Sequence, residues 1–228
     1  PGVPEDASNL CCRAAAAFAE AARIPPRWSL TLEKRIPVAG GCGGGSSDAA
    51  STLSLLNRMY GDPLSQETLH GLATRLGADV PFFLQSSPAR ATGIGEKLVP
   101  IPGSLRCGLV LANPGFPIPA SWAYAHWRDL PKPPATDPEA LLKALAAGDA
   151  PGVAAQTYNV FDAAICRKFP VLALLLEDLR AAGCWAAHVS GSGPTVFGLC
   201  PGAQATAVAG KLRKTHGESL WTAGLDLG

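Results

Sequence analysis

Hydrophobic residues recur at intervals of three or four along several stretches of the chain, and this spacing predicts amphipathic helices. The stretches are residues 8–24, 49–60, 65–77, 170–184 and 203–216. In the third stretch Ser65 is a candidate N-cap, and Leu64 and Leu69 have the spacing of a hydrophobic staple. Gly77 is expected to end that helix.

Shorter runs with a period of two predict strands. Residues 29–37 (SLTLEKRIP) alternate Leu30 and Leu32 with polar residues, which predicts a strand closed by Pro37. Residues 185–200 contain two short apolar runs around a glycine–serine turn. Further extended chain is expected at residues 89–101, with turns at two glycines, and at residues 106–115 and 220–228, and the proline-rich residues 130–138 are expected to form a loop.

This order of elements predicts an α+β protein with two domains, at residues 1–98 and 99–228. In the second half a strand, helices, a strand–turn–strand unit, a helix and a last strand follow one another. That order is typical of helices packed on one face of an antiparallel sheet. The 228 residues, 47% of them hydrophobic, suffice for one large core or two modest ones.

Charge and cysteine content exclude several classes of protein. A formal net charge of +1, with 16% charged residues, offers no basic surface for nucleic acid or for a membrane. No apolar run reaches membrane-spanning length, and the start of the chain does not resemble a signal peptide. The seven cysteines include no C-x-x-C pair, so we expect reduced thiols and a cytoplasmic location.

A glycine run precedes the second predicted helix and has two possible interpretations. Residues 40–47 read GGCGGGSS. Glycine–serine runs occur in flexible linkers, but this one joins a predicted strand directly to a predicted helix. Glycine lets backbone N–H groups converge on an anion, and a helix N-terminus adds unpaired donors, so a phosphate cradle is favoured. The hydroxyls of Ser46 and Ser47 could cap the helix, contact phosphate or reach a metal ion. The run matches neither the Walker A nor the dinucleotide-binding pattern.

Two other segments are candidates for the same site. Asp79 follows the helix-ending Gly77 and precedes an apolar run, a setting in which a carboxylate can act as a general base. A lone loop aspartate more often caps a turn or is simply solvated. The second glycine–serine turn, around Gly191, could equally be an ordinary hairpin.

Three segments together resemble the GHMP kinases, which are named after galactokinase, homoserine kinase, mevalonate kinase and phosphomevalonate kinase. PVAGGCGGGSSDAAS begins at Pro37, LGADVPFF at Leu76 and VSGSGPTVFGL at Val189, in the order of the family. The resemblance covers nearly the whole chain and implies a two-domain fold with an incomplete N-terminal domain and a ferredoxin-like C-terminal α/β sandwich. GIGEKLVPI and NPGFPIPASWAY resemble the branch that phosphorylates the 2-hydroxyl of the methylerythritol part of a cytidine diphosphate conjugate, on the methylerythritol phosphate route to isoprenoids.

The resemblance also implies roles for the matching residues. Asp79 matches the catalytic aspartate, and Gly191, Ser192 and Gly193 match a motif that braces the phosphate loop and borders the substrate. Ser47 is a candidate Mg²⁺ ligand. The implied cofactors are ATP and Mg²⁺, the implied partner is a small-molecule substrate, and a monomer or weak dimer is expected. The implied ATP-binding residues are Lys34, Pro37, Val38, Ala39, Gly40, Gly41, Cys42, Gly43, Gly44, Gly45, Ser46 and Ser47.

The chain departs from the family pattern at three places. Nothing before Asn9 resembles the first motif, whose lysine acts with the aspartate, so we expect about sixty residues of a full-length relative to precede Pro1. This chain alone is expected to show little turnover. Cys42 stands where relatives usually have leucine, and Ala120 where many have a hydroxyl residue. The alternatives are a homoserine- or mevalonate-type kinase, a nucleotide-binding protein without catalysis, and a purely structural domain.

Overall fold

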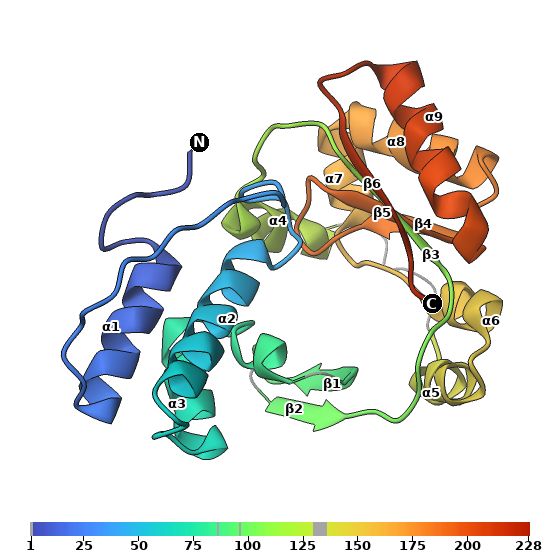
Figure 1. The fold of residues 1–228 in the computed structure, drawn as a ribbon. Helices are drawn as coiled ribbons and strands as arrows, with labels where there is room; N and C mark the ends of the chain where they lie inside the picture. The colour runs from blue at the N-terminus through green and yellow to red at the C-terminus, as the bar shows by residue number, and fades with distance from the viewer. Residues whose placement is uncertain (1, 86, 96, 130–135) are drawn as a thin grey trace. The chain divides into compact units, whose positions relative to one another are not determined.

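The computed structural model describes residues 2–85, 87–95, 97–129 and 136–228. The chain forms two compact units (Figure 1). Unit 1 contains the chain up to Val38 and then Gly43–Ile101, and unit 2 contains Ala39–Cys42 and Pro102–Gly228. The glycine run is thus divided between the units. The expected domain ranges, 1–98 and 99–228, stay a prediction.

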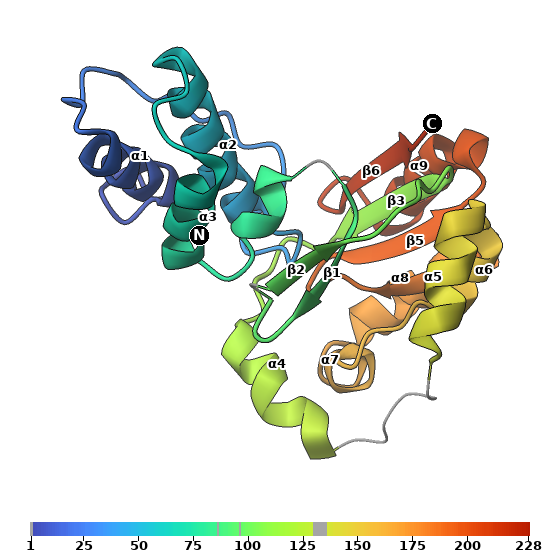
Figure 2. The ribbon, with the colours of Figure 1, turned by 90° about the horizontal axis from the view of Figure 1, so that it is seen from below.

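Unit 1 is built on three helices that contact one another. They are α1 (Leu10–Ala22), α2 (Gly44–Met59) and α3 (Gln66–Leu76), followed by the short helix η1 (Pro81–Leu84) and the hairpin β1 (Ala89–Thr92) and β2 (Lys97–Pro100) (Figures 1 and 2). The three predicted helices are confirmed. The oxygen of the Ser65 side chain accepts from the Thr68 N–H at 3.2 Å, which confirms the N-cap. Leu69 joins Phe18 and Leu53 in the core.

The predicted strand at residues 29–37 is wrong, because this segment is irregular. A strand needs a neighbour that accepts and donates its backbone hydrogen bonds. None of the described residues pairs with this segment, since the only ladder of unit 1 among them joins β1 to β2. As a result Leu30, Leu32 and Ile36 remain about two-fifths exposed instead of lining one buried face.

Unit 2 contains a four-stranded antiparallel sheet, as predicted. Its strands β3 (Gly108–Asn113), β4 (Ala186–Val189), β5 (Val196–Cys200) and β6 (Trp221–Asp226) lie in the order β4-β5-β3-β6. The long helix α8 (Pro170–Ala181) precedes β4, and α9 (Ala205–His216) joins β5 to β6. This order and these two crossovers are those of the ferredoxin-like sandwich.

Helices pack against both faces of the sheet, so the expectation of helices on one face alone is wrong. Neighbouring side chains on a strand point to opposite sides, and each set meets different helices. Val110, Val196 and the apolar faces of α8 and α9 form the main core. On the other face Leu199 and Phe197 pack with α6 (Ala150–Gln156), which contacts α5 (Pro138–Ala147) (Figure 2). The remaining elements are α4 (Ala120–His126), η2 (Trp127–Asp129), α7 (Asp162–Lys168) and η3 (Gly202–Gln204). Most of the predicted loop at 130–138 lies outside the described residues.

All seven cysteines are free thiols, as predicted. Burial raises the pKa of the Cys184 thiol to about 12, and that of Cys166 to about 11, so both stay protonated at neutral pH. Within the described part of the chain, no helix combines the length and the apolar character needed to cross a membrane.

Candidate functional site

The glycine run brings a helix N-terminus and its free donors to the surface of unit 1. Helix α2 begins at Gly44, and its N-cap Gly43 has a left-handed backbone with φ of 65° and no side-chain capping bond. The idea that a serine caps this helix is therefore wrong: Ser46 and Ser47 lie inside its first turn. The hydroxyl of Ser47 donates to the Gly44 carbonyl at 2.9 Å. Among the described residues, the backbone N–H groups of Gly44, Gly45 and Ser46 have no acceptor. Three unpaired donors at a helix start form a site for an anion.

A lysine ammonium lies beside these donors. Lys34 Nζ forms an ion pair with an Asp48 carboxylate oxygen, and both side chains are largely buried, with 14% and 21% exposed. A Cβ atom added to Gly44 would lie 2.9 Å from Lys34 Nζ, so the ammonium touches the first turn of α2. The predicted residue Lys34 is therefore brought next to the predicted loop. Asp48, which holds it there, was missed because an aspartate within a helix carries no distinctive sequence signal.

Asp79 lies just before η1 and is exposed, although the residues that follow it are apolar. A Cβ added to Gly95 would lie 3.5 Å from Asp79 Oδ1. The same short segment reaches the glycine run through Phe83, whose ring would be 2.7 Å from a Cβ on Gly43. The segment Asp79–Phe83 thus joins the aspartate to the loop within unit 1.

The part of the loop that belongs to unit 2 is fastened to the second glycine–serine turn. The Thr195 N–H donates to the Gly40 carbonyl at 3.1 Å, and the Ser190 hydroxyl donates to the Gly41 carbonyl at 3.0 Å. Gly41 has φ of 76°, and a Cβ there would lie only 2.2 Å from the Ser190 carbonyl oxygen. Only glycine fits so close an approach of two backbones. The predicted Gly40 and Gly41 are thereby brought beside the predicted turn.

The turn itself lies between β4 and β5, as the sequence indicates. Gly191 and Gly193 have φ of 56° and 75°, the left-handed region that favours glycine. A Cβ on Gly191 would lie 3.0 Å from the Gly41 carbonyl oxygen. Ser192 forms no hydrogen bond with the described residues, so its hydroxyl and N–H are free for a ligand. Sequence reasoning did not single out Ser190, although it lies within the quoted motif.

The remaining predicted loop residues show less distinctive contacts. Pro37 and Val38 lie in irregular chain and a turn, and Ala39 has φ of 55°. Cys42 Sγ lies 3.8 Å from the Gly40 carbonyl oxygen. Among the described residues, no three histidine, cysteine, aspartate or glutamate side chains lie close enough together to hold a metal ion.

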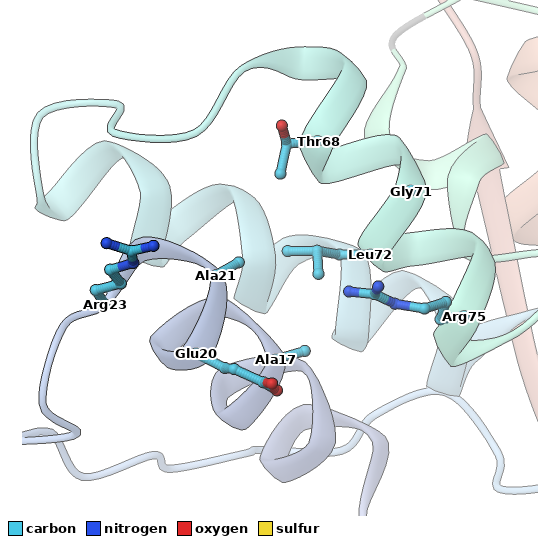
Figure 3. A pocket seen from close by; sticks show the side chains of 8 residues that line it. All are labelled: Ala17, Glu20, Ala21, Arg23, Thr68, Gly71, Leu72 and Arg75. Carbon is cyan, nitrogen blue, oxygen red and sulfur yellow. The ribbon is translucent and has the colours of Figure 1, made fainter.

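Unit 1 contains two cavities that are not lined by any residue of the glycine run. A cavity of about 550 Å³ opens between α1 and α3, with Arg23 and Arg75 at its rim (Figure 3). None of its lining residues was predicted for the site. A smaller cavity of about 250 Å³ is lined by residues 28–32 and by α2, including Asp48.

Comparison with known proteins assigns the class. Residues 9–87 match the GHMP kinases N terminal domain, and residues 141–218 match the GHMP kinases C terminal domain. These matches cover more than half of the chain, which therefore belongs to the GHMP kinases, a class of small-molecule kinases. The predicted α+β class and GHMP kinase fold are confirmed.

Individual relatives place the chain more narrowly. A relative from Symbiobacterium thermophilum, named 4-diphosphocytidyl-2-C-methyl-D-erythritol kinase, is 42% identical over 201 residues, which are 86% of this chain and 70% of the relative. A crystal structure of 4-(cytidine 5'-diphospho)-2C-methyl-D-erythritol kinase matches with a TM-score of 0.82 and 37% identity, over 100% of this chain and 81% of that chain. The chain belongs to this family of kinases within the GHMP class. A homoserine kinase structure from Cytophaga hutchinsonii, with a TM-score of 0.73 and 15% identity over 99% of this chain and 78% of its own, shares the fold alone.

Proposed function

We propose that this protein transfers the γ-phosphoryl group of ATP to the 2-hydroxyl of 4-diphosphocytidyl-2-C-methyl-D-erythritol, a step in the methylerythritol phosphate route to isoprenoid precursors. The observation that carries the proposal is the set of unpaired N–H groups at Gly44, Gly45 and Ser46, beside the Lys34 ammonium. The match to relatives named for this activity, over 86% of the chain, selects the substrate. A cytoplasmic location and a monomer or weak dimer stay predictions.

The loop residues supply the electrostatic part of phosphoryl transfer. Residues 37–47 are the proposed ATP-binding segment, and the N–H groups at the start of α2 face the phosphates. Phosphoryl transfer depends on positioning the reacting groups and neutralising charge on the phosphate oxygens, and fixed backbone donors do both. Lys34 adds a positive charge that Asp48 keeps in place. Because these groups are already oriented, little reorganisation is needed when the nucleotide binds.

Asp79 is the proposed proton acceptor. Its exposed carboxylate has no hydrogen-bond partner among the described residues, so it is free to accept the proton of the substrate hydroxyl. The turn at Gly191–Gly193 is the proposed brace of the loop and border of the substrate, which agrees with the bonds that the flanking Ser190 and Thr195 donate to Gly41 and Gly40.

The residues present fit an ATP–Mg²⁺ complex. Mg²⁺ prefers oxygen ligands, keeps several waters and is often held by one or two protein groups together with nucleotide phosphates, so it needs no dedicated protein cage. Ser47 is the proposed protein ligand, although its hydroxyl donates to the Gly44 carbonyl, because a hydroxyl oxygen can still offer a lone pair. When bound, the ion would neutralise charge on the phosphates.

ATP with Mg²⁺ should stabilise the folded protein. A ligand that binds only the native state raises the free energy of unfolding by about 2.7 kcal/mol at a hundredfold excess over its dissociation constant. Replacing Gly44 by valine should abolish this shift, because the new Cβ would lie 2.9 Å from Lys34 Nζ and branched carbons would cover the N–H donors. Thermal unfolding with and without the nucleotide measures both effects.

A matched control keeps the glycine-to-valine change but moves it from the site. Gly71 lies in α3, and a Cβ there meets no atom within 4 Å. Gly71→Val should therefore keep the full nucleotide shift. The phosphate cradle would be refuted if ATP with Mg²⁺ did not raise the unfolding temperature of the folded wild-type protein. The same result is required of the full-length gene product.

The choice of alcohol separates the proposed function from its nearest alternatives. We expect the full-length gene product to phosphorylate 4-diphosphocytidyl-2-C-methyl-D-erythritol many times faster than homoserine or mevalonate. The reason is that the 37–42% identity to relatives of the first kind contrasts with 15% to a homoserine kinase. An assay coupled to ADP release compares the three alcohols at equal concentration. Preference for homoserine or mevalonate would move the protein to another branch of the class.

A further inference from the structure

A segment outside the three motifs forms hydrogen bonds with the glycine–serine turn between β4 and β5 in unit 2. Asn159 lies between α6 and α7, and its side-chain amide donates to the carbonyls of Val189 at 2.7 Å and Gly191 at 2.8 Å. Its own carbonyl oxygen accepts from the Phe161 N–H at 2.9 Å. Both amide hydrogens and the oxygen of this side chain are therefore used, so its orientation is fixed.

Asp162, the first residue of α7, holds the same strand end by its carboxylate. One oxygen accepts from the Val189 N–H at 2.9 Å, and the other lies 2.6 Å from His188 Nδ1. Val189 is consequently bound at both its N–H and its carbonyl, by two different side chains of the 159–162 segment. The peptide groups before and after Val189 are therefore both held, and the backbone at Val189 loses most of its freedom to rotate.

These bonds set the direction of a free donor. The peptide between Gly191 and Ser192 is trans, so its N–H points away from its carbonyl. Because Asn159 binds the Gly191 carbonyl, the Ser192 N–H must point away from Asn159. That N–H has no acceptor among the described residues. The turn thus presents an oriented, unpaired donor on the side opposite its anchor.

The same turn also carries the start of the glycine loop. The Ser190 hydroxyl donates to the Gly41 carbonyl, and the Thr195 N–H donates to the Gly40 carbonyl. The Thr195 hydroxyl in turn accepts from the Asn113 side chain at 2.8 Å within the core. Any rotation of the Val189–Gly191 backbone would therefore move residues 40 and 41 as well.

We propose that Asn159 and Asp162 are positioning residues of the kinase, which hold the Ser192 N–H and the Gly40–Gly41 segment in the geometry for phosphoryl transfer. This inference rests on the proposed function.

Asn159→Asp tests the proposal with almost no change of shape. The aspartate keeps an oxygen for the Phe161 N–H but cannot donate to the carbonyls of Val189 and Gly191. We expect kcat in the full-length gene product to fall about ten- to a hundredfold, since small misplacements of positioned groups cost up to about that much. The dissociation constant for ATP, measured by calorimetry, should change less than about fivefold, because the bonds that Ser190 and Thr195 donate to residues 41 and 40 are not removed and the loop stays attached to the turn.

Asn57 offers a matched control of the same chemistry. Its amide donates to an Asp62 oxygen at 3.0 Å and to the Leu64 carbonyl at 3.1 Å, and its oxygen accepts from the Leu64 N–H at 3.0 Å. It fixes a turn of unit 1 that contains no proposed site residue. Asn57→Asp should lower the thermal midpoint like Asn159→Asp, yet leave kcat within about twofold.

Hydrogen exchange without nucleotide reads the positioning directly. Asn159→Asp should speed exchange at residues 40–42 and 190–195, whereas Asn57→Asp should not.

Asp162→Asn should retain most of kcat because its amide oxygen can still accept from the Val189 N–H, while Asp162→Ala should lose most of kcat. Unchanged kcat or unchanged exchange at 40–42 in Asn159→Asp would overturn the inference. Failure of the wild-type protein to bind ATP, with the exchange pattern as expected, would overturn the proposed function alone.

Discussion

Gly41→Ala is expected to weaken ATP binding at least about a hundredfold. The new Cβ would lie 2.2 Å from the Ser190 carbonyl oxygen and 2.9 Å from that of Gly193, and both are backbone atoms that cannot rotate away. The left-handed φ of 76° adds about 1 kcal/mol or more of strain for alanine. The loop must therefore leave the turn and lose its bonds from Ser190 and Thr195. Calorimetry with ATP and Mg²⁺ measures the loss.

The clash can be separated from the backbone strain by a second glycine. Gly61 has nearly the same φ, 77°, but a Cβ there meets nothing within 4 Å. Gly61→Ala should carry the strain alone, with a modest loss of stability and an unchanged dissociation constant for ATP. Equal ATP affinity in Gly41→Ala and wild type would show that the attachment of residues 40 and 41 to the turn does not matter for the nucleotide.

The sequence predicted best those elements whose signals are local. Helix α3 has a capping serine, a candidate staple and a buried apolar face within thirteen residues, and the structure confirms the cap and the buried face. The sheet of unit 2 was predicted because glycines and short apolar runs mark its turn. Similar local signals occur in α5, with Asp137 accepting from the Glu139 N–H and Gly148 ending the helix in a left-handed conformation. They were overlooked because proline and alanine dominate the surrounding sequence.

Elements that depend on a partner were predicted poorly. Residues 29–37 have the alternation of a strand, yet alternation describes only which side chains could share a face. Whether a ladder forms depends on a neighbouring strand, and no described residue supplies one. The start of α2 was misplaced for a related reason: Gly44 and Gly45 disfavour a helix by intrinsic preference, but the tertiary packing of α2 against α1 and η1 extends it over them.

The residues of the candidate site divide in the same way between local signals and signals that depend on a partner. The glycine run and Asp79 are visible as motifs, whereas the side chains that orient them are not. Asp48 is fourteen residues from Lys34, and Asn159 is thirty-two residues from Gly191. No periodicity in one sequence relates residues so far apart, and each pair is brought together only by folding. The groups that bind can thus be read from the chain, while the groups that position them require the structure.

Asp79→Asn is expected to lower turnover by roughly 10²–10⁴ in the full-length gene product, the usual contribution of a positioned proton acceptor. The substitution keeps the size of the side chain but removes its capacity to take the hydroxyl proton of the substrate. ATP binding should stay within about threefold of wild type, because the proposed phosphate donors are the N–H groups of α2 and the Lys34 ammonium. Steady-state kinetics and calorimetry on the same samples separate the two quantities.

Asp6 provides the matched control, since it is also an exposed aspartate of unit 1. Its carboxylate accepts from the N–H and the hydroxyl of Ser8, far from the glycine run in the sequence, so Asp6→Asn should leave turnover unchanged. Asp79 lies four residues before Phe83 of η1, whose ring is beside Gly43 at the start of α2, and η1 contacts α2, so the segment that carries the carboxylate packs against the helix that carries the phosphate donors. A proton acceptor held in this way acts on kcat rather than on affinity. If Asp79→Asn kept nearly full turnover, the carboxylate would be an ordinary loop residue, and the proton would have to leave the hydroxyl by another route.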